Sequence, residues 1–145
     1  MSVFGSMDVS ATGMTAQRLR TDTISQNIAN INTTRTADGT PYYRKTVVFE
    51  EKDFTCFQDC LSFATGTMGK GVKVSGIVED RDTELRKVYD PSHPDADEEG
   101  YVYYPNVNTV EEMTNMIDAS RAYEANVTVF NGTKSMIMAA LQMGK

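Results

Sequence analysis

The segment from Asp90 to Gly100 holds the side chains of this sequence that come closest to a metal site. Its acidic residues and glycine match positions 1, 3, 5 and 6 of a calcium-binding loop: Asp95, Asp97, Glu99 and Gly100. Position 12, however, is Asn106, where such loops carry a glutamate that binds the ion through both oxygens. An acidic-loop calcium-binding module is therefore kept only as an alternative, and no metal or cofactor is expected.

One histidine and two cysteines are the remaining candidates for catalytic chemistry. His93 stands among prolines with no nucleophile placed to suggest a partner, which favours an exposed or turn-capping side chain. Cys56 and Cys60 are four residues apart, and this spacing fits neither a Cys-x-x-Cys redox pair nor a zinc pair. We therefore expect no catalytic residue and do not expect an enzyme.

The composition argues against several other classes. The 145 residues carry 20 acidic and 14 basic side chains, a formal net charge of -6, and no run of Lys and Arg offers a site for nucleic acid. No apolar stretch is long enough for a membrane span. The N-terminus also lacks the basic segment followed by an apolar segment that marks a cleaved secretory signal. The length suits one domain with one core. The composition predicts neither nucleic-acid binding nor membrane insertion.

The stretch 108–145 predicts one long amphipathic helix. Its seam positions alternate in spacing between three and four residues, as in a heptad repeat: Met113, Met116, Ser120, Tyr123, Val127, Phe130, Lys134, Ile137 and Leu141. Asn108 is followed three residues later by Glu111. Thr109 is likewise followed by Glu112, so each pair fits a capping box at the start of the helix. The helix, about 50 Å long at 1.5 Å per residue, predicts an elongated molecule.

A second helical stripe covers residues 6–31, with these positions on one side: Met7, Ala11, Met14, Thr21, Ile24, Ile28 and Ile31. Gly13 interrupts it, and two explanations stay open. A neighbour packs too closely for a side chain, or the glycine is tolerated at about 1 kcal/mol relative to alanine. Neither helix can bury its stripe alone in water, so the two should pair.

The region between the helices predicts strands at 42–51, 72–78, 84–89 and 101–104, while residues 52–65 leave a short helix and a packed loop equally open. The fold class is therefore α+β. We expect an elongated, antiparallel, coiled-coil-like pair of N- and C-terminal helices with a small β-containing middle region. The predicted division is an N-terminal helix in 1–35, a β-rich middle in 36–107 and a C-terminal helix in 108–145.

Both predicted helices resemble signatures of one family. Residues 10–34, centred on Asn-Ile-Ala-Asn at 27–30, resemble the N-terminal signature of bacterial flagellar rod and hook proteins. Residues 111–138 resemble the matching C-terminal block, which here includes Ala-Ser-Arg-Ala-Tyr-Glu-Ala-Asn at 119–126. The stretches 89–97 and 100–107 and the short length are most similar to a proximal rod protein of the flagellar basal-body rod protein family. Another axial rod protein of that family is the alternative.

The resemblance implies a structural subunit without catalytic chemistry. Such a protein would leave the cell uncleaved through the flagellar type III export apparatus and polymerise helically in the periplasm. It would form part of the rod of the bacterial flagellum basal body, the drive shaft that transmits torque from motor to hook. The implied partners are further copies of itself, other proximal and distal rod proteins, the protein at the junction of MS ring and rod, and the export apparatus.

A lone helix pair should be only marginally stable. Burial contributes about 1.5–3 kcal/mol per large side chain, and ordering costs about 1–2 kcal/mol per residue, so neighbouring subunits should complete it. The predicted seam and assembly residues are Met7, Met14, Ile24, Asn27, Ile28, Asn30, Ile31, Met113, Met116, Arg121, Tyr123, Asn126, Val127, Phe130, Ile137 and Leu141. Asn27, Asn30 and Asn126 should fix the register by hydrogen bonding, with an exposed helix face as the alternative. Gly132 has no role that the sequence supplies.

Overall fold

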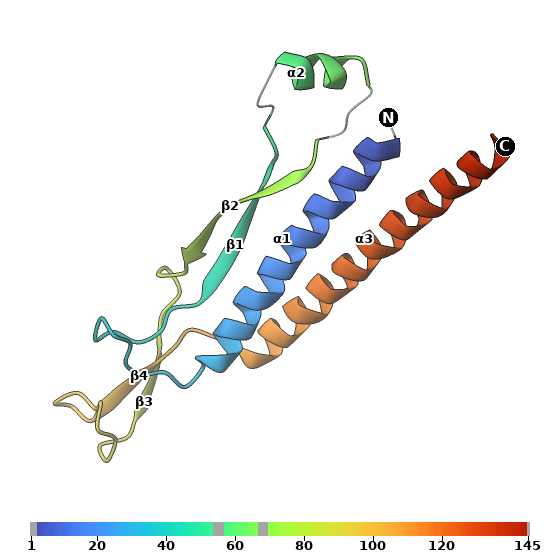
Figure 1. Cartoon of the computed structure of the whole chain (residues 1–145). Helices are drawn as coiled ribbons and strands as arrows, with labels where there is room; N and C mark the ends of the chain where they lie inside the picture. The colour runs from blue at the N-terminus through green and yellow to red at the C-terminus, as the bar shows by residue number, and fades with distance from the viewer. Residues whose placement is uncertain (1–2, 54–56, 67–69, 145) are drawn as a thin grey trace.

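Two long helices lie side by side and form the body of the molecule (Figure 1). The computed structural model describes residues 3–53, 57–66 and 70–144. Helix α1 (Val3–Ala29) and helix α3 (Thr109–Met143) run in opposite directions, so both chain ends lie at the same end of the molecule. The predicted α+β fold with an elongated antiparallel helix pair is confirmed.

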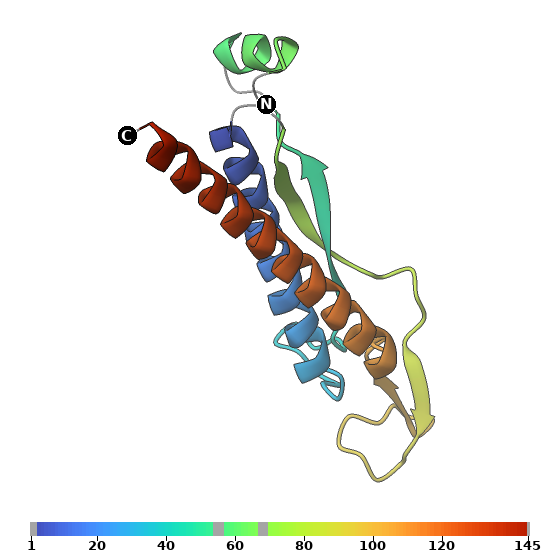
Figure 2. The ribbon, with the colours of Figure 1, turned by 90° about the vertical axis from the view of Figure 1, so that its right-hand side faces the viewer.

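A two-stranded ribbon lies along α1. Strand β1 (Lys45–Glu51) pairs antiparallel with β2 (Val72–Glu79), with a register shift between Val48 and Phe49. The ribbon covers the side of α1 away from α3 (Figures 1 and 2), so α1 is the middle layer of three. Helix α1 is therefore the element that both neighbouring layers pack against.

A close backbone contact fastens the ribbon to α1. The Thr12 hydroxyl accepts a hydrogen bond of 3.2 Å from the Val72 N–H. A Cβ atom on Gly71 would lie 2.5 Å from the Thr12 Oγ1, closer than such atoms can approach. Glycine at position 71 is therefore required for the ribbon to reach the helix.

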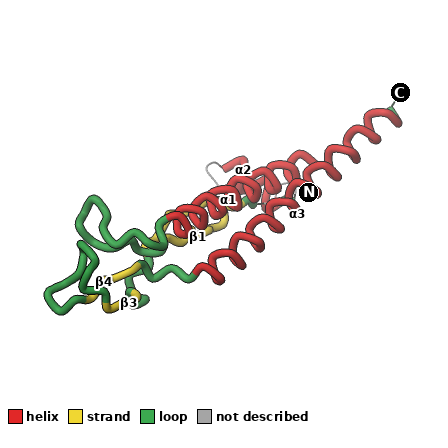
Figure 3. Tube along the Cα trace, turned by 90° about the horizontal axis from the view of Figure 1, so that it is seen from below, coloured by secondary structure: helices red, strands yellow, loops and turns green. Residues whose placement is uncertain are grey.

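A second, smaller ribbon lies at the end of the molecule opposite the two chain ends (Figure 3). Its strands β3 (Arg86–Tyr89) and β4 (Tyr101–Tyr104) pair antiparallel, and the acidic loop connects them. The Lys87 ammonium lies 4.1 Å from the centre of the Tyr101 ring, and the Val102 side chain is fully buried. The four predicted strands are thus present, with β1 and β3 beginning later than expected.

Helix α2 (Phe57–Ala64) lies at the other end, near the N-terminus (Figure 1). It decides the open question for residues 52–65 in favour of a short helix. Among the described elements it packs against none, and its side chains Phe57, Leu61 and Phe63 are exposed. Cys56 lies outside the described residues, and Cys60 is an exposed free thiol.

The ends of the long helices differ from the prediction in detail. Asn108 caps α3 by accepting a hydrogen bond of 3.1 Å from the Val110 N–H. The predicted capping boxes are wrong, because Glu111 and Glu112 both turn to the Arg44 side chain instead. Helix α1 ends at Ala29, so the predicted helical positions 30 and 31 fall in the turn that follows.

The hydrophobic core is thin. Among the described residues, six apolar side chains are buried: Ala16, Ile24, Tyr42, Val102, Val107 and Ala119. No helix in the described part of the chain combines the length and apolarity that a membrane crossing requires. The molecule is therefore held together at a few points along its length.

Candidate functional site

A buried polar cluster joins the end of α1 to the beginnings of β1 and α3. We call its four side chains, Asn27, Tyr42, Arg44 and Glu112, the neck cluster. The Asn27 Oδ1 accepts hydrogen bonds of 2.9 Å from the Tyr42 hydroxyl and from the Lys45 N–H. Its Nδ2 donates to the Lys45 carbonyl at 2.8 Å and to the Glu112 Oε2 at 2.9 Å. Every donor and acceptor of this amide, which is 1% exposed, is therefore satisfied.

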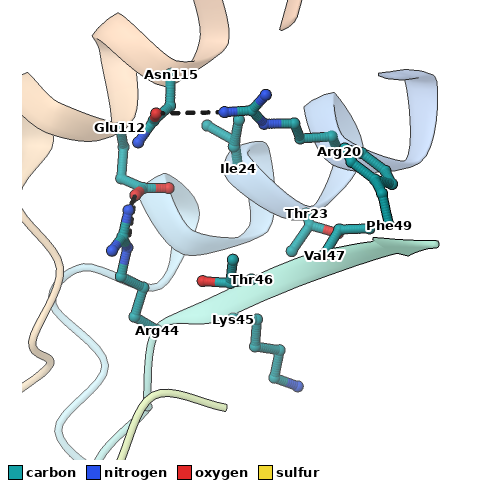
Figure 4. A pocket seen from close by; sticks show the side chains of 10 residues that line it. All are labelled: Arg20, Thr23, Ile24, Arg44, Lys45, Thr46, Val47, Phe49, Glu112 and Asn115. Carbon is teal, nitrogen blue, oxygen red and sulfur yellow. Dashed lines mark hydrogen bonds and ion pairs between the residues drawn. The ribbon is translucent and has the colours of Figure 1, made fainter. Parts of the chain in front are cut away.

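The neck cluster also contains a buried ion pair. Glu112 is 1% exposed, and its Oε1 accepts from the Arg44 Nε at 2.8 Å and from its Nη2 at 2.7 Å (Figure 4). The second oxygen accepts from Asn27, so both carboxylate oxygens are occupied. A buried charge is tolerated when it is paired and hydrogen-bonded, and this one is both.

Tyr42 is the hydroxyl donor of the cluster. Burial of the side chain raises the pKa of Tyr42 above its ordinary value of 10.0, and the charges of Glu112 and Glu79 raise it further. The phenol therefore keeps its proton throughout the physiological range and continues to donate to Asn27.

Asn106 extends the cluster toward the small ribbon. Its Oδ1 accepts from the Arg44 N–H at 2.9 Å, and its Nδ2 donates to the Asp80 carbonyl at 2.8 Å. The residue considered for position 12 of a calcium loop thus ties backbone segments together. Asp95, considered for position 1, accepts from the Thr34 hydroxyl at 2.8 Å. Within residues 3–53, 57–66 and 70–144, no group of three or more His, Cys, Asp or Glu is placed to hold a metal ion.

The surface between α1 and α3, which we call the seam, is lined by small and polar residues. On α3, its centre repeats every seven residues, at Glu112, Ala119, Asn126 and Thr133. Opposite Asn126 lies Gly13 of α1, where an added Cβ would come within 3.1 Å of the Asn126 amide. This contact supports the first explanation for Gly13, a close neighbour. Small side chains here let the two backbones approach closely.

The predicted apolar stripe of α3 is offset from the seam by about one residue. Four of its members are half-buried beside the centre: Met116, Val127, Phe130 and Ile137. Burial of Met113, Tyr123 and Leu141 between the helices is wrong, because these side chains are 56%, 40% and 66% exposed. Arg121 is exposed as well. The predicted stripe follows apolar character, whereas the centre of the seam holds small and polar residues.

The predicted residues of α1 lie closer to their expected places. Ile24 and Asn27 are buried, and four others are half-buried, namely Met7, Met14, Ile28 and Ile31. Of the three asparagines, Asn27 bonds across the helices. Asn30 and Asn126 donate to their own helix, to the carbonyls of Gln26 and Ala122. The predicted register-setting hydrogen bonds from these two residues are absent from the described part of the chain.

Many apolar side chains of α3 face solvent. The outward residues, as we call them, are between 40% and 82% exposed: Val110, Met113, Ile117, Tyr123, Val129, Met136, Met138, Leu141 and Met143. Val129, Met136 and Met143 are spaced by seven residues and so share one side of the helix. An extended apolar surface of this kind marks a site of contact with other proteins.

Three members of the neck cluster escaped prediction from the sequence. The sequence pattern places Tyr42 and Arg44 in a predicted strand and Glu112 in a predicted capping box. The available signal was the pair of glutamates in the first turn of a predicted helix that also carries an asparagine cap. Only one glutamate is needed at a capping box, so the second was free for another partner.

Two protein families and several relatives match the chain. Residues 7–35 match the family described as flagella basal body rod protein, and residues 98–143 match flagellar basal body rod FlgEFG protein C-terminal. Flagellar basal-body rod protein FlgC of Bacillus subtilis (strain 168) is 46% identical over 151 residues, covering 100% of both chains. The FlgC proteins of Borreliella burgdorferi and Aquifex aeolicus (strain VF5) are 48% and 40% identical. They cover 97% and 94% of this chain, and 97% and 92% of their own lengths.

Proposed function

This chain belongs to the flagellar basal-body rod protein family, among its FlgC-like members, and from that premise we propose that it polymerises helically with further copies of itself and with other rod proteins. It is a structural subunit, and its place is the rod of the flagellar basal body. In our proposal the polymer is the drive shaft that transmits torque from motor to hook, and the chain has no catalytic role.

The proposal also covers the route and the neighbours of the subunit. The chain would be exported uncleaved through the flagellar type III apparatus and would assemble in the periplasm. Its neighbours would be other proximal and distal rod proteins and the protein that joins the MS ring to the rod. The support for these finer statements is the family membership itself.

The outward residues of α3 are the observation that carries helical assembly. They leave apolar surface uncovered on a helix that already packs its small and polar side on α1. Covering one Met or Val side chain contributes about 1.5–3 kcal/mol, so neighbouring subunits would gain stability along much of the helix. The neck cluster would meanwhile hold the helix pair and both ribbons together while load passes through the subunit.

Aspartate substitution of an outward residue tests this proposal. Met136→Asp places a charge where we expect a neighbour to exclude water, whereas Ser135→Asp adds the same charge one position away on the exposed surface. In cells that depend on this chain, we expect Met136→Asp to abolish rod assembly and motility while export of the chain continues. Ser135→Asp should leave both nearly intact.

A second pair, Val129→Asp and Thr128→Asp, repeats the comparison one heptad earlier. Phe130 is a poorer choice, because it is half-buried against the seam and its substitution would disturb the helix pair itself. Normal rods and motility with both Met136→Asp and Val129→Asp would refute assembly through the outward residues.

A further inference from the structure

A pocket between α1, β1 and α3 presents hydrogen-bond donors around apolar walls (Figure 4). Its volume is about 210 Å³, and Ile24, Val47 and Phe49 form its apolar side. The Arg20 guanidinium reaches toward Asn115 (Figure 4). The pocket thus combines room for a long side chain with a cationic group at its wall.

The donors of this pocket have few acceptors among the described residues. The Arg20 Nη2 lies 3.5 Å from the Asn115 Oδ1, and the described residues offer its guanidinium no carboxylate within ion-pair distance. The Asn115 amide N–H₂ and the Thr46 hydroxyl donate to no acceptor within the described ranges. Glu112, which also lines the pocket, is already saturated by Arg44 and Asn27. A guanidinium that has one long hydrogen bond and no ion pair is suited to a carboxylate, which it binds through two parallel hydrogen bonds.

The acidic loop between β3 and β4 carries carboxylates, and two of them have no partner among the described residues. The Asp90 carboxylate accepts a hydrogen bond from the Ser92 hydroxyl, and the Asp95 carboxylate accepts one from the Thr34 hydroxyl. The side chains of Glu98 and Glu99 are exposed and have no hydrogen bond or ion pair in the part of the chain that the structure describes.

Backbone bonds hold this loop in one conformation. The Asp90 N–H donates to the Gly100 carbonyl at 3.0 Å, and the Asp97 N–H donates to the Tyr101 carbonyl at 2.9 Å. The glutamates are therefore presented at the end of the molecule on a fixed turn, which lowers the entropy lost on binding.

We propose that the Arg20 pocket of one copy binds the Glu98 and Glu99 carboxylates of a second copy, an inference that rests on the proposed assembly of this chain into a rod. The pocket is lined by residues of α1, β1 and α3, whereas the acidic loop lies at one end of the molecule (Figures 1 and 2). A contact between two different surfaces does not close into a dimer, and its repetition generates a ring or, where the rotation does not close, a helical filament. Two different contact surfaces on one chain are thus compatible with the proposed rod, in which each copy would contact the next.

Charge reversal tests the contact in cells whose rod is built with this chain. Arg20→Glu alone should abolish rod formation, because it sets like charges against each other. Glu98→Arg with Glu99→Arg should do the same. All three changes in one chain should restore rods, since the pair is then rebuilt with its signs exchanged. Arg18→Glu, an exposed position on the same helix, and Glu84→Arg, outside the loop, are the controls and should leave rods intact.

Crosslinking then identifies the occupant. In a chain with Cys56→Ser and Cys60→Ser, we combine Thr46→Cys at the pocket with Glu98→Cys in the loop and treat isolated basal bodies with a short bismaleimide. Dimers of the chain are expected, and none should form when Glu84→Cys replaces Glu98→Cys.

The outcomes separate this contact from the proposed function. Rods that form without dimers, or that survive Arg20→Glu, would overturn the contact and leave the rod function standing. Failure of the triple variant to restore rods would overturn the second copy as the source of the carboxylates. Absence of rods from cells carrying the unaltered chain would instead overturn the proposed function.

Discussion

Asn27 is the residue through which α1, β1 and α3 are joined. Its amide satisfies both backbone groups of Lys45, the Tyr42 hydroxyl and one oxygen of Glu112. A substitution of Asn27 would leave those buried groups without partners, and each unsatisfied group costs about 1–3 kcal/mol. The side chain therefore fixes the position of three elements at once, which no apolar residue of the same size can do.

The pH dependence of stability reports on Tyr42. Because burial raises the pKa of Tyr42, the folded chain binds this proton more tightly than the unfolded chain does. The resulting stability is fully present below the unfolded pKa of about 10 and is lost as the pH rises through the higher folded value. We expect the free energy of unfolding to fall more steeply above this pH in the natural chain than in Tyr42→Phe.

Urea unfolding followed by circular dichroism from pH 7 to 11 measures this difference. At neutral pH Tyr42→Phe should cost about 0.5–1.5 kcal/mol, the contribution of one hydrogen bond. Parallel curves for the two chains across the alkaline range would contradict the assigned burial of Tyr42.

The ion pair of the neck cluster gives a second prediction. Arg44→Met removes the cation and leaves the buried Glu112 carboxylate with Asn27 as its remaining partner. Breaking a buried pair in this way costs about 3–5 kcal/mol, a large part of the stability of a small domain. We expect loss of the cooperative unfolding transition, or a correspondingly lower urea midpoint.

The control is the double variant Arg44→Met with Glu112→Met, which removes both charges and should recover much of the lost stability. Arg81→Met, which removes a fully exposed cation paired with Glu79, should leave the midpoint nearly unchanged. Equal midpoints for the Arg44 and Arg81 variants would show that the buried pair is not important for stability.

At the scale of elements, α1 is constrained on two sides and α3 on one. Helix α1 carries the ribbon on one side, through contacts such as Thr12 with Gly71, and α3 on the other, through Gly13. Helix α3 packs on α1 alone among the described elements, so most of its circumference remains free. The difference explains why so many exposed apolar side chains belong to α3.

Gly13 of α1 and Gly132 of α3 provide a matched pair of substitutions. Gly132→Ala meets nothing within 4 Å, so the better helix propensity of alanine should stabilise the chain by up to about 1 kcal/mol. Gly13→Ala gains the same propensity but brings its methyl group to 3.1 Å from the Asn126 amide. We therefore expect a smaller gain, or a loss, measured by thermal unfolding of the two variants side by side.

Asn126→Ala in the Gly13→Ala background is the control, because it removes the contacting amide. A gain from Gly13→Ala equal to that from Gly132→Ala would contradict close packing at this point of the seam.

The long helices can be predicted from the sequence, because their periodic patterns run over many turns and the second helix starts at a recognisable cap, Asn108. The sequence is insufficient for the side of α3 that meets α1. Periodicity locates apolar residues, and here Ala119 and Thr133 occupy the seam while Met136 and Leu141 face outward. The neck cluster joins positions 27, 44 and 112, which only the folded chain brings together. Helix α2 was ambiguous because eight residues are too few for a periodic signal.

At the scale of the whole molecule, stabilising contacts and uncovered surface are separated. The neck cluster lies where α1 ends and α3 begins, and it holds one end of the helix pair with buried polar contacts. Toward the two chain ends the seam continues with small residues, and exposed apolar side chains accumulate: Phe4, Phe57, Leu61, Met138, Leu141 and Met143. The subunit is thus fixed internally at one end, and in the proposed rod its neighbours would cover the apolar surface along the rest.

The central claim, that neighbours cover the outward residues in the rod, can be measured by cysteine labelling. In a chain with both native cysteines changed to serine, single cysteines are placed at Val129→Cys and Met136→Cys, with Thr133→Cys in the seam as the buried control. In the isolated chain, a maleimide should label the first two quickly and the third slowly. In isolated rods, we predict that the first two become as unreactive as the third. Labelling of positions 129 and 136 at the same rate in rods as in the isolated chain would contradict the account.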